Sequence, residues 1–180
     1  MTFDAIEQQG LPDDEKIRRN YEAVKEYSKN IDSNIRNGCG LILSGSYGTM
    51  KTTMAVAVLR ALIDDNRRGL LVPMCSLIDN LYTMRSLDRE EWARYEQRIR
   101  NTPLLVIDDL GGENTDQSWI LSKVDSIITE RYNKMHPIII TTNLLPDELE
   151  GTYSGRIIDR LMSTSKLLTF NGKSQRRQNR

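Results

Sequence analysis

The chain has 180 residues, of which 38% are apolar and 28% charged, a composition typical of one soluble domain. A chain of this length buries roughly 70% of the surface that its unfolded form exposes, so neither disulfides nor a structural metal are needed, and a second full domain is excluded. The 25 basic and 25 acidic side chains cancel, which excludes a general attraction to nucleic acid or to an anionic membrane.

The first predicted element is a charged amphipathic helix over residues 11–36, where apolar side chains recur every three or four positions. Pro12 and the acidic residues 13–15 predict its beginning, and Asn37 with Gly38 predicts its end. Residues 1–10 lack the basic and apolar regions of a signal peptide, and no window approaches the about 18 apolar residues of a membrane span. We therefore expect a cytoplasmic protein that does not enter a membrane.

Short apolar runs then alternate with helical patterns along the rest of the chain. The predicted strands cover residues 40–44, 70–74, 103–107 and 137–141. The predicted helices cover residues 52–65, 76–86, 89–100 and 119–133. Uninterrupted apolar strands separated by helices indicate an α/β fold whose parallel sheet is covered on both faces. In such sheets ligands bind at the carboxyl ends of the strands, so the polar residues that follow each run are the candidates for chemistry.

Residues 45–53 read GSYGTMKTT and lie between a predicted strand and a predicted helix, as a phosphate-binding loop requires. We expect the loop amides and the helix N-terminus to face a polyphosphate, Lys51 to reach the outer phosphates and the Thr52 hydroxyl to bind Mg²⁺. Glycine usually precedes the lysine, but this chain has Met50 there, which predicts weaker nucleotide binding. The alternative is a glycine turn with a solvated lysine. The predicted nucleotide-binding residues are Gly45, Ser46, Tyr47, Gly48, Thr49, Met50, Lys51, Thr52 and Thr53.

Two aspartates follow the third apolar run. Asp108 is the expected metal ligand beside Thr52, and Asp109 is the expected base or water-orienting group, with Glu113 as a substitute on the next loop. Asn143, after the fourth run, is expected beside the terminal phosphate and the water. Without an upstream phosphate loop, such residues at strand ends more often form turns or cap helices.

The ordered segments GSYGTMKTT, LLVIDDLGGE, IIITTN, GRIIDRL and FNGKSQRR resemble the DnaC/IstB-like branch of AAA+ ATPases, the helicase loaders and transposition helper ATPases. This resemblance implies a P-loop NTPase fold with a five-stranded parallel sheet flanked by helices. It implies an ATPase core over residues 38–177, a helical extension over residues 1–37 and a basic end at residues 178–180. The implied cofactors are ATP and Mg²⁺. A replicative helicase or a transposase, other copies of the chain and single-stranded DNA are the implied partners.

The resemblance also implies roles for three arginines. Arg160 matches an arginine finger that acts on ATP held by a neighbouring subunit, and Arg156 is a candidate auxiliary residue. The alternative is an exposed pair on one helix face with Asp159 as its counter-charge. Arg176 falls near the family's sensor 2 position. The segment from Lys166 to Arg180 holds no acidic residue and predicts either a basic patch for phosphate backbone or a solvated terminus.

Two features of the chain bear on the implied loader and ATPase roles. Loaders of this family carry a separate amino-terminal module, whereas only residues 1–37 precede the core here. A degenerate loop is also compatible with a clamp that binds nucleotide without hydrolysing it.

Cys39 and Cys75 form neither a Cys-x-x-Cys pair nor part of a His/Cys ligand set, which argues against a zinc site and a disulfide framework. His136, the single histidine, has no acid or nucleophile near it in sequence and is expected to be structural.

Overall fold

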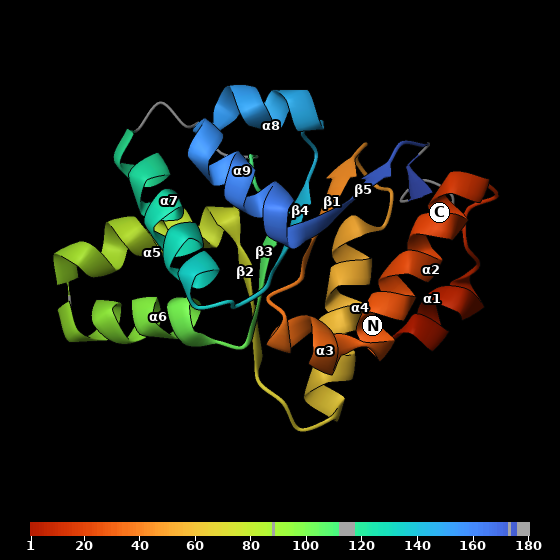
Figure 1. Ribbon diagram of the computed structural model, residues 1–180, viewed down its shortest axis with the longest axis horizontal. Helices are drawn as coiled ribbons and strands as arrows, with labels where there is room; N and C mark the ends of the chain where they lie inside the picture. Colours follow the sequence, from red (N-terminus) through yellow and green to blue (C-terminus); the bar gives the residue numbers. More distant parts are fainter. Residues whose placement is uncertain (88, 112–117, 173, 176–180) are drawn as a thin grey trace.

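A computed structural model describes residues 1–87, 89–111, 118–172 and 174–175. Among these residues, five parallel strands form one sheet in the order β2-β3-β4-β1-β5 (Figure 1). The strands are β1 (Gly40–Gly45), β2 (Gly69–Pro73), β3 (Leu104–Asp108), β4 (Ile138–Thr142) and β5 (Ser165–Phe170). The parallel α/β sheet that the apolar runs predict is therefore confirmed.

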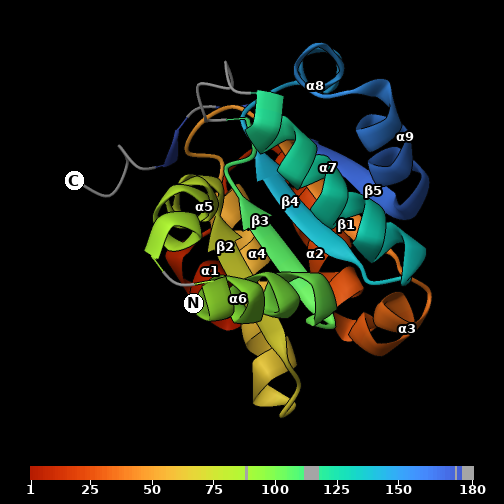
Figure 2. The same cartoon turned by 90° about the vertical axis from the view of Figure 1, so that its left-hand side faces the viewer.

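Helices cover both faces of the sheet (Figure 2). One layer holds α1 (Phe3–Gln9), α2 (Glu15–Lys29), α3 (Ile31–Arg36) and α4 (Lys51–Asp64). The other holds α5 (Met74–Leu87), α6 (Arg89–Asn101), α7 (Ser118–Asn133), α8 (Pro146–Thr152) and α9 (Gly155–Thr164). The layers are distinguished by alternation along the strands. In β3, Leu104 and Val106 join the cluster under α1–α4, while Leu105 and Ile107 join the cluster under α5–α9.

The single helix predicted over residues 11–36 is wrong, because the chain forms α2 and α3 there, with α1 before them. Asp14, and not Pro12, starts α2: its side chain accepts a hydrogen bond from the Ile17 amide over 3.0 Å. Asn30 separates the two helices. Its side chain donates to the Glu26 carbonyl over 3.1 Å, and its backbone amide donates to the same oxygen over 3.1 Å.

The fifth strand replaces the beginning of the predicted basic tail. Residues 165–170 pair with β1 along its whole length, and Leu168 and Phe170 are buried in the α1–α4 cluster. Lys166, which was expected in a basic or solvated terminus, is instead an exposed residue of this edge strand. Burial on one face with polar residues on the other is sufficient for an edge strand, so a continuous apolar run was not required.

The strand register determines which polar residues meet at the carboxyl edge of the sheet. Ile107 of β3 is level with Ile140 of β4, which brings Asp108 beside Thr141. Ser44 of β1 is level with Thr142 of β4, which brings the phosphate-loop segment beside Asn143. None of the described helices is both long and apolar enough to cross a membrane.

Candidate functional site

The loop between β1 and α4 is a tight turn that depends on two glycines. Gly45 has φ +123° and Gly48 has φ +73°, values that favour glycine. A Cβ at Gly45 would collide with the Phe170 carbonyl, and a Cβ at Gly48 would collide with the Ser174 side chain. The segment that follows β5 therefore packs directly against this loop. Two backbone hydrogen bonds, from Ser46 N to Phe170 O and from Gln175 N to Gly48 O, each 2.9 Å long, join the two segments.

Met50 adopts the backbone conformation for which glycine is usually selected. Its φ of 69° and ψ of 12° lie in the left-handed region, which costs a residue with a Cβ roughly 1–2 kcal/mol. The half-buried methionine side chain packs against the apolar cluster shared with α1 and α2, which offsets part of this cost. Met50 is also the N-cap of α4 and makes no side-chain capping hydrogen bond. The helix therefore presents its N-terminus to the loop without an acceptor from its cap side chain.

Lys51 is buried, with 6% of its surface exposed, and closes the loop from inside. Its Nζ donates to the carbonyl oxygens of Gly45 and Ser46, each over 2.7 Å, and to Asn143 Oδ1 over 2.9 Å. The buried Thr49 hydroxyl donates to the Ser46 carbonyl over 2.8 Å. Lysine, loop and the end of β4 are thus linked by hydrogen bonds before any anion binds.

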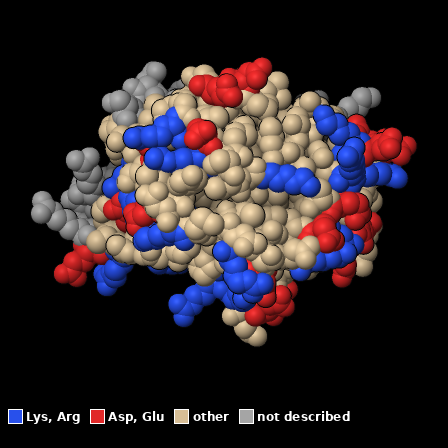
Figure 3. All heavy atoms as spheres, in the orientation of Figure 1, with Lys and Arg blue, Asp and Glu red and all other residues tan. Residues whose placement is uncertain are grey.

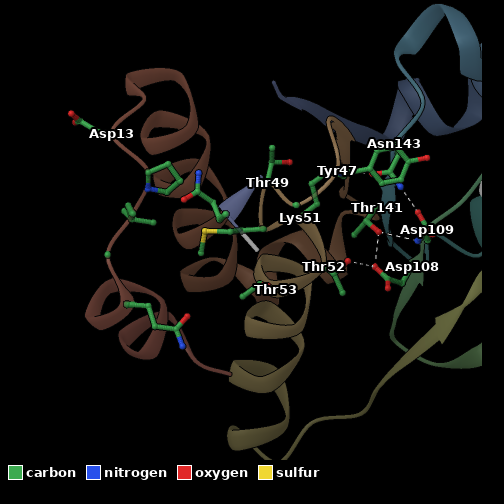
Figure 4. A pocket seen from close by; sticks show the side chains of 17 residues that line it. Asp13, Tyr47, Thr49, Lys51, Thr52, Thr53, Asp108, Asp109, Thr141 and Asn143 are labelled. Carbon is green, nitrogen blue, oxygen red and sulfur yellow. Dashed lines mark hydrogen bonds between the residues drawn. The ribbon is translucent and has the colours of Figure 1, made fainter. Parts of the chain in front are cut away.

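A second chain of hydrogen bonds joins α4 to the ends of β3 and β4 (Figure 4). Asp108 Oδ1 accepts from the Thr52 hydroxyl over 2.8 Å and from the Thr141 hydroxyl over 2.6 Å. Thr141 Oγ1 also accepts from the backbone amide of Asp109 over 2.9 Å. The Asp109 carboxylate accepts from the side-chain amide of Asn143 over 2.6 Å. The structure thus brings Thr52, Asp108, Asp109 and Asn143 together, as the sequence predicts.

These residues surround a cavity of about 670 Å³, a size common for small-molecule sites. The phosphate loop from Tyr47 to Thr53 lines one side, and Asp108, Asp109, Thr141 and Asn143 line another. Tyr47 is 72% exposed at this edge, while Gly45 and Ser46 contribute the carbonyls that Lys51 holds. Residues 9–13, between α1 and α2, form the opposite wall, to which Asp13 belongs (Figure 4).

Sequence reasoning missed three parts of this cavity. Thr141 was treated as the last residue of a strand, although a hydroxyl at a strand end beside Asp108 is a signal that could have been used. Gln175 lines the cavity because the segment after β5 crosses the loop. The wall formed by residues 9–13 carries no recognisable motif, so only the packing of α1 and α2 places it here.

The donor set fits a magnesium nucleotide. A glycine-dependent loop, a buried lysine and an open helix N-terminus suit a polyphosphate. Mg²⁺ favours oxygen ligands and is commonly held by one or two carboxylates together with phosphates and water. Asp108 and the Thr52 hydroxyl supply such oxygen atoms. No group of three or more His, Cys, Asp or Glu residues forms a metal cage within the described part of the chain.

Two of the predicted arginines, Arg156 and Arg160, are not among the described residues that line the cavity. Arg160 lies on α9 and bonds to Thr129 and Asp125 of α7, and Arg156 pairs with the same aspartate. The alternative of a pair with Asp159 as its counter-charge differs from the structure, in which Asp125 of α7 pairs with both arginines because α9 packs against α7. Side-chain exposure is 66% for Arg156 and 20% for Arg160, so the pair is not uniformly exposed. Arg176 and Glu113, which were expected near the nucleotide, lie outside the described residues.

Two curated relatives match most of this chain in sequence. The chain is 24% identical over 169 residues to the replicative helicase loader DnaI of Bacillus subtilis, covering 87% of this chain and 53% of that protein. It is 28% identical over 182 residues to the insertion sequence IS21 putative ATP-binding protein of Pseudomonas aeruginosa, covering 97% of this chain and 62% of that protein. The chain thus spans between about half and two thirds of the length of these two relatives.

Solved structures share the fold. The crystal structure of the DnaC helicase loader matches with a TM-score of 0.82 and 26% identity, over 94% of this chain and 96% of that one. AMPPCP-bound DnaA from Aquifex aeolicus matches with a TM-score of 0.76 and 19% identity, over 97% of this chain and 51% of that one. Both likenesses support a P-loop fold of the AAA+ type. The sequence model of the IstB-like ATP binding protein family matches residues 24–180. With most of its length matched by this model, the chain belongs to the family of IstB-like ATP binding proteins.

Proposed function

We propose that the chain is a Mg²⁺-dependent, oligomeric ATPase that uses ATP binding and hydrolysis to control a DNA replication partner and single-stranded DNA. The observation that carries this proposal is the connected set of hydrogen bonds at the cavity. Thr52 and Thr141 both bond to Asp108, while Asn143 bonds to Asp109 and Lys51. Three segments far apart in the sequence therefore place a lysine, two hydroxyls, two carboxylates and an amide at one phosphate-binding loop.

Each of these groups has a distinct role in the proposed reaction, in which water attacks the γ-phosphate of ATP. Lys51 exchanges its loop carbonyl acceptors for phosphate oxygens, and Thr52 and Asp108 hold the metal. A bound Mg²⁺ supplies charge neutralisation on the phosphates. Asp109 orients the attacking water, and Asn143 holds the Asp109 carboxylate in place. Arg160 acts from α9 of a neighbouring copy, where it stabilises the charge that develops on the transferred phosphoryl group.

Phosphate release, measured with and without single-stranded DNA over a range of protein concentrations, tests this proposal. We expect Mg²⁺-dependent turnover that rises more steeply than protein concentration, because Arg160 acts between subunits. Lys51→Ala should abolish turnover. Lys134→Ala is the matched control, because Lys134 pairs with Glu130 on α7 and does not line the cavity. Nucleotide binding without any phosphate release would instead identify a nucleotide-dependent clamp.

The protein partner is proposed from the two relatives. The DnaI relative favours a replicative helicase, and the IS21 relative favours a transposase as the second candidate. Gel filtration of the purified chain with each purified protein, in the presence of ATP or ADP, separates the two. Co-elution with the helicase and not with the transposase supports the first candidate, and the reverse result supports a transposition helper.

A further inference from the structure

The arginine pair on α9 is held by one polar cluster on α7. Arg160 Nη1 donates to Thr129 Oγ1 over 2.6 Å and lies 3.4 Å from Asp125 Oδ1. Thr129 Oγ1 in turn donates to Asp125 Oδ1 over 3.0 Å. The Arg160 guanidinium also lies over the Tyr132 ring, 5.8 Å from its centre. Three side chains on successive turns of α7 thus determine where this guanidinium lies.

The second carboxylate oxygen of this aspartate has its own partner. Asp125 Oδ2 pairs with Arg156, one turn earlier on α9, so both oxygens are engaged and the carboxylate cannot rotate freely. Its side chain is only 15% exposed, which limits screening by water. One carboxylate is thus shared by two guanidinium groups and does not neutralise both of them.

The contacts with α7 use only part of the Arg160 guanidinium group. Both hydrogen bonds of the Arg160 side chain within the described residues use Nη1, and neither Nε nor Nη2 has a partner there. A guanidinium binds phosphate with two of its N–H groups in one plane. Fixing a free arginine side chain in one orientation costs conformational entropy. Contacts that fix it before the phosphate arrives remove most of this cost from the step that uses it.

The packing of α9 also has an apolar part. Ile157, Ile158 and Leu161 of α9 are buried in the α5–α9 cluster together with Ile127 and Ile128 of α7. The polar cluster therefore adds to an apolar interface, and its shared partner is the Arg160 guanidinium.

We propose that Asp125 and Thr129 are positioning residues, which orient the Arg160 guanidinium toward the nucleotide bound by a neighbouring copy of this chain. The inference rests on the proposed function, because it assumes hydrolysis between subunits. Neither residue touches the nucleotide in its own subunit, since neither lines the cavity. Their removal should therefore lower kcat and leave nucleotide affinity unchanged.

The first test compares substitutions within the full chain. Asp125→Asn and Thr129→Val should each lower kcat about 10- to 100-fold, with the Kd for a fluorescent ATP analogue unchanged. Thr129→Ser keeps the hydroxyl and should recover most of the activity that Thr129→Val loses. Asp159→Asn removes a carboxylate of the same charge from α9 itself and serves as the control for net charge. A wild-type kcat in both Asp125→Asn and Thr129→Val overturns the inference.

The second test separates positioning from folding. Lys51→Ala carries an inactive loop but an intact arginine cluster, and Asp125→Asn carries the reverse. Mixed in equal amounts, they should be more active than the two variants measured separately and added, because with random pairing roughly a quarter of the interfaces join two intact halves. A mixture no more active than the sum of its parts overturns the inference. A wild-type chain that releases no phosphate at any concentration overturns the proposed function first, and this inference with it.

Discussion

The side-chain amide of Asn143 donates a hydrogen bond to the Asp109 carboxylate over 2.6 Å. Its oxygen accepts from Lys51 Nζ over 2.9 Å, so one amide links the lysine of the loop to the acid at the end of β3. Asp109 has a left-handed backbone with φ +60°, which is uncommon for a residue other than glycine. Movement of Lys51 toward an anion would therefore change the hydrogen bond between Asn143 and Asp109.

Substitution of Asn143 tests this link. Asn143→Ala removes both hydrogen bonds, and we expect kcat for ATP hydrolysis to fall about 100-fold while nucleotide binding changes little. The physical reason is that Lys51 keeps its loop acceptors, whereas Asp109 loses the donor that orients it. Single-turnover phosphate release and a binding titration measure the two effects separately. Asn101→Ala, at the opposite end of the sheet, is the control, and equal losses in both assays for Asn143→Ala would contradict the assigned role.

The strained backbone at Met50 predicts a gain on substitution by glycine. Met50→Gly removes the side chain from the phosphate-binding loop together with a left-handed strain of about 1 kcal/mol, so ATP should bind about fivefold more tightly. Met50→Ala keeps a Cβ on the same backbone and should show no such gain. Isothermal titration with a non-hydrolysable ATP analogue measures both. An unchanged or weaker affinity in Met50→Gly would show that the loop accommodates the methionine.

Gly48 tests the contact between the loop and the segment after β5. Gly48→Ala places a Cβ against Ser174 at a residue with φ +73°, so both strain and collision oppose the native loop. We expect at least a tenfold loss of nucleotide affinity and a lower Tm. Adding Ser174→Gly should recover part of the affinity by relieving the collision but not the strain.

Gly151→Ala is the matched control for this experiment. Gly151 lies in α8, and its added Cβ would meet no atom within 4 Å. We expect its Tm to stay the same or rise slightly, because alanine is favoured over glycine in a helix. A Gly48→Ala chain that behaves like Gly151→Ala would show that the segment after β5 does not constrain the loop.

The docking of α1 is expected to depend on pH through Glu7. Hydrogen bonds from Lys25 and Tyr21 lower the pKa of Glu7 below its ordinary value of 4.5. A carboxylate whose pKa is lower in the folded state stabilises the fold above its unfolded-state pKa and loses this effect as pH falls through the folded value. Glu7→Gln should therefore melt below wild type at pH 7, and the difference should disappear in acid, once the pH has fallen through the folded-state pKa of Glu7.

Circular dichroism melts of Glu7→Gln and wild type, recorded from pH 7 down into acid, check the prediction. Glu15→Gln, an exposed residue in the first turn of α2, is the control for net charge. A difference in Tm that persists at the acid end would mean that the side-chain charge of Glu7 is not what anchors α1. Because the turn after α1 lines the cavity, nucleotide affinity should follow the same pH trend in Glu7→Gln.

Surface charge follows the sequence expectation on the face shown in Figure 3, where lysine and arginine side chains are interspersed with acidic ones. The balance of 25 basic and 25 acidic residues thus does not conceal a large single-sign patch on that face. Charged side chains instead act through local ion pairs, such as those of Asp125 with its two arginines.

Local pattern was sufficient for the central strands, the phosphate loop and its acidic partners. The apolar runs of β1, β3 and β4 are buried on both faces, and the polar residues of the candidate site follow these runs directly. Neighbouring residues are therefore enough to predict both the strands and the site residues at their ends. The break at Asn30 and the strand β5 were mispredicted from the same kind of pattern. The helix break lies where the Asn30 side chain bonds to the Glu26 carbonyl. The strand β5 is explained by its edge position in the sheet.

The pairing of distant residues required the folded chain. Thr141 meets Asp108 through strand register, Asp125 meets Arg160 through packing of α7 on α9, and residues 9–13 reach the cavity because α1 and α2 cover α4. None of these contacts leaves a periodic trace along the chain, because each depends on a distance between segments. Amino-acid order thus determined the fold class and the chemistry available, and long-range packing selected which groups share a site.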